Sequence, residues 1–162
     1  MKRVLRTVLV ATGVAFALDA VSAGAAVTVT FTKPDSYADM PFTARDREDV
    51  MKDLQKHFDK MGAKLPQGQD LKVEVLDIDL AGRIEPRFRG ANDIRVLRGS
   101  ADWPVIQLRY SIESQGKVVK SGEARVADMN YLQSHISSYS SNESLRYEKK
   151  MLDDWFKTVL KQ

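Results

Sequence analysis

A change of phase within one predicted strand constrains this chain more than any other sequence feature. In residues 71–80, LKVEVLDIDL, the apolar side chains fall at Leu71, Val73 and Val75 and then at Leu76, Ile78 and Leu80. Side chains alternate between the two faces of a strand, so an unbroken strand would turn the later set away from the face that holds the earlier one. One extra residue near Val75–Leu76, a β-bulge, returns both sets to one buried face. The alternative is a strand that is covered on both faces. With the bulge, Asp77 and Asp79 share the solvent side, about 7 Å apart.

The first 26 residues have the pattern of a secretory signal peptide. Three basic residues open this segment, and residues 7–18 form an apolar stretch that is short for a membrane span. Small residues then fit the pattern of a cleavage site between Ala23 and Ala26. We therefore expect residues 1–26 to be removed and residues 27–162 to form a single exported domain, with no stable membrane insertion afterwards. A short membrane anchor is the alternative.

Composition excludes several classes of protein. The leader contains three basic residues and Asp19, so residues 27–162 keep 22 basic against 21 acidic side chains. A nearly neutral domain gives no support to nucleic-acid binding, so no nucleic-acid partner is expected. Cysteine is absent, which excludes disulfides and a lipid-anchored cysteine. The chain also lacks a zinc spacing, a calcium loop and a phosphate-binding glycine motif, so we expect no metal site and no cofactor.

A strand and a helix are predicted to precede the bulged strand. Val27–Thr32 alternates strictly between apolar residues and threonine, a pattern that is typical of a half-buried strand. Residues 43–62 place their apolar side chains in one helical stripe, with Thr43 as the N-cap and Gly62 as the stop. His57 borders this stripe, and we interpret it as a packing residue rather than a base.

The second half of the chain predicts a hairpin and a final helix. Residues 105–113 and 118–127 alternate on either side of a glycine-containing turn, and Gly122 indicates a bulge or a close approach. Apolar residues of segment 145–160 form one broad helical face, near which Glu148 needs a cationic or polar partner. The order predicts an α+β fold: a mostly antiparallel sheet of four to five strands with two main helices packed on one face.

Several segments together resemble a known family. VTVTFTKPDSYADM, VLDIDLAGR and YEKKMLDDWF are similar to a bacterial family of small exported proteins, domain of unknown function number 3016. The resemblance covers nearly all of residues 27–162, and its most specific pieces are Pro34–Tyr37, Asp77–Arg83 and Asp154–Phe156. It implies an exported bacterial domain of similar layout, periplasmic or secreted. It implies no activity and no binding residues, because the family has none assigned.

The candidate site combines two aspartates with the arginines that follow them in the sequence. Asp77 and Asp79 on one face can share a proton or bind a cation. Arg83, Arg87 and Arg89 supply guanidinium groups, which fork onto phosphate or carboxylate. The alternative is that these aspartates and arginines pair with one another, which contributes only about 0–1 kcal/mol for each exposed pair.

Two functions follow from this site. The first is a non-catalytic periplasmic domain that binds an envelope protein or an anionic ligand, which the lack of a recognisable catalytic set favours. The second is a small hydrolase that uses Asp77 and Asp79 with a nearby arginine. The hydrolase requires both aspartates to converge in a deep pocket, with a strongly raised pKa for at least one. A third, weaker hypothesis is an inhibitor or chaperone-like module that uses a sheet edge such as Val27–Thr32.

Overall fold

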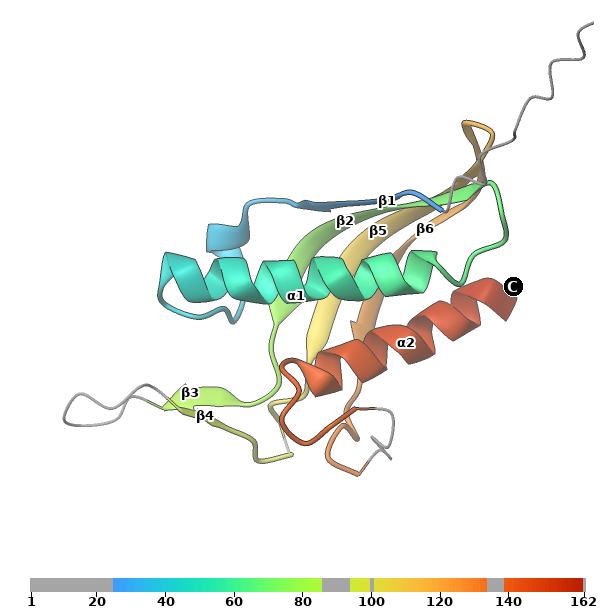
Figure 1. The fold of residues 1–162 in the computed structure, drawn as a ribbon. Coiled ribbons are helices and arrows are strands. Elements are labelled where there is room, and N and C mark those ends of the chain that lie inside the picture. Colours follow the sequence, from blue (N-terminus) through green and yellow to red (C-terminus); the bar gives the residue numbers. More distant parts are fainter. Residues whose placement is uncertain (1–24, 86–93, 100, 134–138, 162) are drawn as a thin grey trace, which may run out of the picture.

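The computed structural model describes residues 25–85, 94–99, 101–133 and 139–161 (Figure 1). Four strands form one sheet in the order β1-β2-β5-β6, and a separate two-stranded sheet pairs β3 with β4. The strands are β1 (Val27–Phe31), β2 (Gln69–Asp79), β3 (Arg83–Glu85), β4 (Ile94–Val96), β5 (Val105–Ser114) and β6 (Lys117–Ala127). The helices are α1 (Ala44–Gly62) and α2 (Arg146–Lys161), with a short 3-10 helix, η1 (Pro34–Ser36), after β1. The predicted α+β fold is confirmed.

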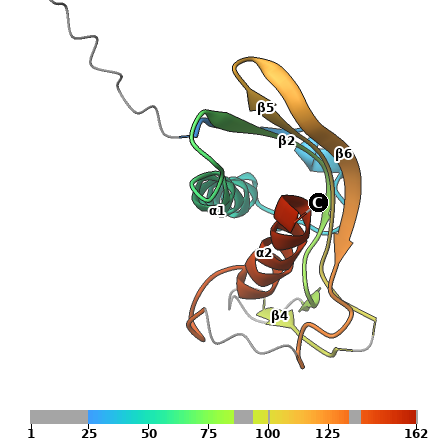
Figure 2. The same cartoon turned by 90° about the vertical axis from the view of Figure 1, so that its right-hand side faces the viewer.

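The four-stranded sheet is mostly antiparallel, as expected, but it is mixed, because one of its three pairings is parallel. β2 pairs antiparallel with β5, and β5 with β6, but β1 runs parallel to β2. Parallel neighbours need a crossover connection, and α1 supplies it between β1 and β2. Figure 2 shows the sheet curving around α2, with α1 on the same side, so the two helices share one face.

The predicted bulge in β2 is present. The register with β5 shifts between Val75 and Asp77, which leaves Leu76 without a partner. On both sides of the shift the apolar residues are buried: Val75 and Ile78 are fully buried and Leu80 is 2% exposed. The extra residue therefore keeps both halves of the strand turned towards the helices.

The two helices cover the core, and α1 differs from the prediction in the role of Gly62. Leu54 and Phe58 of α1 and Leu152 and Phe156 of α2 are buried against the sheet. The Asp46 amide donates to Thr43 Oγ1 at 3.1 Å, which confirms the N-cap. Gly62, expected to stop α1, is instead its last residue, and a Cβ there would lie 2.1 Å from Val27 Cγ2. Close packing against β1, rather than a turn, requires this glycine.

No helix within the described residues is both long and apolar enough to cross a membrane.

Candidate functional site

A cavity of about 540 Å³ lies where the end of β2 meets the segment that follows β1. The segment is fixed to β2 by three contacts: Tyr37 OH donates to the Val75 carbonyl at 2.9 Å, the Asp39 amide donates to the Ile78 carbonyl at 3.0 Å, and Asp39 forms a β-bridge with Asp79. The charged lining is Asp35, Asp39, Arg47, Asp79, Arg83 and Asp102. The cavity therefore brings together side chains from four separate parts of the chain.

The two predicted aspartates have different environments. Asp77 Oδ1 accepts a hydrogen bond from the Ala38 amide at 2.8 Å, and Asp77 does not line the cavity. The Asp79 side chain lines the cavity and makes no hydrogen bond or ion pair with any described residue. Burial raises the pKa of Asp79, and the nearby carboxylates of Asp39 and Asp77 raise it further. Asp77 thus holds the loop in place, whereas the Asp79 carboxyl remains available to a ligand.

Two arginines near the cavity, Arg95 and Arg98, have partners within the protein. Arg95 donates to Asp39 Oδ2 at 2.6 Å and to the carbonyl oxygens of Ala81 and Gly82 at 3.1 and 3.2 Å. Arg98 pairs with Glu85. These two arginines therefore pair with acidic residues, but neither pairs with Asp77 or Asp79.

Arg83 is the exception among the arginines that the sequence singled out. Its side chain is exposed, lines the cavity, and has no hydrogen bond or ion pair with the described part of the chain. Arg87 and Arg89 lie outside the described residues. Among the described residues, Arg83 is thus a lining cation with no partner in the protein, and it can meet a ligand in this cavity.

Two lining residues, Asp39 and Asp102, were missed by the sequence analysis. Asp102 accepts hydrogen bonds from the amides of Arg98 and Gly99 at 2.7 and 2.9 Å and from Tyr131 OH at 2.9 Å. Burial alone would raise the pKa of Asp102, but these hydrogen bonds outweigh it and lower the pKa. A glycine-containing turn at residues 99–102 was the one local signal for Asp102; nothing in the sequence marks Asp39.

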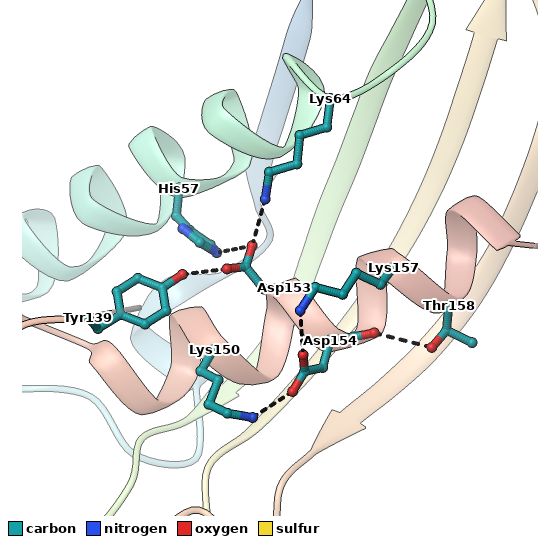
Figure 3. Close-up of polar contacts among 8 residues, drawn as sticks. All are labelled: His57, Lys64, Tyr139, Lys150, Asp153, Asp154, Lys157 and Thr158. Carbon is teal, nitrogen blue, oxygen red and sulfur yellow. Dashed lines mark hydrogen bonds and ion pairs between the residues drawn. The ribbon is translucent and has the colours of Figure 1, made fainter. Parts of the chain in front are cut away.

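A second polar cluster lies between the helices, away from the predicted site (Figure 3). Asp153 of α2 accepts from Tyr139 OH at 2.6 Å and from Lys64 Nζ at 3.2 Å, and His57 Nε2 of α1 lies 3.5 Å from it. Burial would raise the pKa of Asp153, yet the hydroxyl, the ammonium and the imidazole together lower it. His57 is 5% exposed, and its burial lowers the pKa of the imidazole. The hydrogen bonds of Asp153 thus join α2 to the segments beside it, whereas His57 Nε2 is buried 3.5 Å from Asp153 without a hydrogen-bond partner among the residues described.

Glu148 of α2 has the polar partner that its position required. Its side chain is 3% exposed, and Oε1 accepts a hydrogen bond from the Ala81 amide at 2.8 Å. Burial raises the pKa of Glu148, while this hydrogen bond and the charge of Arg95 oppose the rise. The carboxyl thus fastens the start of α2 to the chain just beyond β2.

One protein-family model, described as "Protein of unknown function (DUF3016)", matches residues 25–158. The match spans most of the chain, so the protein belongs to this family, as the segments quoted above indicated. No curated protein and no solved structure matches the chain.

Proposed function

We propose that this member of the DUF3016 family is a non-catalytic domain of the bacterial periplasm that binds an anionic group of an envelope partner or ligand. The proposed site is the cavity beside β2. One observation carries the proposal: Asp79 and Arg83 line the same cavity, and neither has a hydrogen-bond or ion-pair partner among the described residues. The leader-like pattern of residues 1–26 supports the periplasmic location.

The cavity offers three kinds of contact to a ligand. The Arg83 guanidinium can fork onto a carboxylate or a phosphate. Asp79 accepts a hydrogen bond when ionised and can donate one when protonated, a state that its raised pKa favours. Phe42, also in the lining, is 73% exposed, and exposed aromatic side chains often anchor partners. A ligand with one anionic group for Arg83, and with apolar and hydrogen-bonding groups for Phe42 and Asp79, fits this combination.

The hydrolase is the second candidate, and the raised pKa of Asp79 is the observation that favours it. General acid–base catalysis by two carboxylates needs both groups within reach of the substrate. Asp77 instead accepts the Ala38 amide and does not line the cavity. This separation of Asp77 from the cavity is why we favour binding over hydrolysis.

The binding proposal is tested by recovering envelope proteins with the exported protein as bait. We expect Arg83→Ala, and the triple change of Arg83, Arg87 and Arg89 to alanine, to lose a partner that the wild type retains. Lys60→Ala is the matched control, because Lys60 is an exposed lysine of α1 that does not line the cavity. Equal recovery of every partner by the triple variant would overturn the proposal.

Asp79→Asn separates the two candidates. If the protein is a binding domain, the substitution weakens the binding of the captured partner or leaves it unchanged, and the wild type consumes no substrate. In a hydrolase it retains binding but abolishes release of product from the recovered partner, which mass spectrometry of that partner detects.

The leader has its own test: the N-terminus of the exported protein should fall between Ala23 and Val27, and a protein that begins at Met1 would contradict the signal peptide.

A further inference from the structure

We propose that β6 is a dimerisation edge at which two copies of this chain join their sheets into one. Strands β1 and β6 are the two margins of the four-stranded sheet, and Figure 1 shows them at opposite sides of it. The interface is formed by the edge of the sheet and not by the lining of the Asp79 cavity, and it does not depend on the proposed function.

The outer side of β6 is unpaired within the described residues. Among these, the main-chain groups of residues 117–127 pair with β5, and no other described segment forms a main-chain hydrogen bond with them. Eight of the eleven side chains of β6 are exposed. An unpaired row of amide and carbonyl groups is a template for another strand.

The two halves of β6 differ in how well they can accept that strand. The register with β5 shifts near Val119, which is left unmatched, and the Lys120 ammonium turns to the Val159 carbonyl of α2. A bulge and an inward-pointing charge are two devices that block pairing at a sheet edge. From Ser121 to Ala127 the register is continuous and no charged side chain turns inward, so this half of β6 carries neither device.

Charge complementarity favours one register for two antiparallel copies of this half, with the axis at Ala124. Directly opposed residues must point to the same face, so a twofold axis passes through a residue position and not between two residues. An axis at Ala124 places Glu123 of each copy opposite Arg125 of the other, on the face away from the helices. An axis at Glu123 or Arg125 would oppose like charges, which destabilises a sheet. Arg125 makes no ion pair with a described residue of its own chain, although its charge acts on Asp79, and Glu123 already pairs with Arg109; in the dimer, Glu123 of one copy would meet Arg125 of the other as a second cation.

The surface beside β6 on the side of the helices is also large enough for a second copy to cover. A groove of about 440 Å³ runs between β6 and α2, and its lining includes Val126, Met151 and Trp155. Trp155 is half-buried and packs edge-on against Tyr110, with ring centroids 5.3 Å apart. Tyr110 in turn lies over Gly122, where a Cβ would be 3.0 Å from the ring. A second copy joined at β6 would extend over this partly apolar groove.

Sedimentation of the exported protein tests the interface. We expect the wild type to form a concentration-dependent dimer. Arg125→Glu and Glu123→Lys should each weaken it by at least about tenfold, because the two attractive pairs become repulsive. An equimolar mixture of the two variants should recover a heterodimer, since each Glu then faces a basic residue. Glu123→Lys also places a lysine opposite Arg109 of its own chain, where Glu74 remains as the acidic partner, so the folded state of this variant is checked separately.

Arg45→Glu is the matched control, because it makes the same change at an exposed arginine of α1, and it should leave the dimer intact. Thermal unfolding of each variant verifies that it is folded. A wild type that stays monomeric at all concentrations overturns the proposal, as does a mixture that does not associate. If that monomer instead binds a blocked peptide of alternating valine and glutamate, with amide shifts confined to residues 121–127, the edge accepts a foreign strand rather than a second copy.

Discussion

Asp153 and Asp79 are both partly buried aspartates, but the protein satisfies the first and leaves the second unpaired. Asp153 lies between α1 and α2 within reach of a hydroxyl, an ammonium and an imidazole, and its pKa is lowered. Asp79 lies at the end of β2 beside other carboxylates, and its pKa is raised. The ionised form of Asp153 is therefore stabilised by folding, whereas that of Asp79 is not. This difference separates a carboxylate that holds the fold from one that remains available to a ligand.

The largest expected difference between the two follows from removing each carboxylate. Asp153→Ala leaves Tyr139 and Lys64 without their acceptor, and we expect a loss of about 2–3 kcal/mol in the free energy of unfolding. Asp79→Ala removes no such contact and should change it by less than about 0.5 kcal/mol. Urea denaturation of both variants measures this. Equal losses would mean that Asp79 is also structural.

Asp77 offers an intermediate case. Asp77→Ala removes the acceptor of the Ala38 amide, and we expect a loss of about 1 kcal/mol. Asp77→Asn keeps an acceptor oxygen and should be close to the wild type. If both substitutions are neutral in urea denaturation, the contact does not hold the loop, and the assignment of Asp77 as structural is wrong.

The helix cluster should also make stability depend on pH. The pKa of His57 is lowered from 6.5 in the folded state, so as the pH falls the imidazole is protonated more readily in the unfolded chain than in the folded one. Stability is then lost as the pH falls below 6.5. His57→Gln should flatten this fall between about pH 7 and pH 5, measured from urea midpoints. An unchanged slope would show that another group titrates there.

The smallest expected effect is a slight gain from Asp79→Asn at neutral pH. An acidic group with a raised pKa contributes its stability at low pH and loses it as the pH rises through the folded-state pKa. The amide does not ionise, so the variant should gain up to about 0.5 kcal/mol over the wild type at neutral pH and nothing below pH 3.8. A loss at neutral pH would indicate that the ionised Asp79 has a stabilising partner.

Much of the fold could be predicted because its signals are local. Consecutive residues reveal the phase change at Val75–Leu76, the cap at Thr43 and the hairpin around Gly116. The parallel pairing of β1 with β2 was missed, because the direction of a distant partner leaves no mark on an alternating strand. The same limit applies to Gly62, whose role depends on Val27 across the fold.

The candidate site could be predicted only in part. The sequence indicated Asp79 and Arg83, but it paired Asp79 with Asp77, its neighbour on the strand. The structure instead places Asp39 beside Asp79 across a β-bridge, and Arg95 holds Asp39. Asp39 follows β1 by less than ten residues, yet only the docking of its loop on β2 brings it to the cavity.

The sequence by itself determined which side chains face the core, because burial imposes a period on strands and helices that can be read residue by residue. It also placed acidic and basic groups near the end of β2. Only the tertiary structure decided which of those groups are bound within the protein, as Asp77 and Arg95 are, and which have no hydrogen-bond or ion-pair partner among the described residues, as Asp79 and Arg83 do. The physical reason is that hydrogen bonds and ion pairs act over a few ångströms in space, and folding sets those distances.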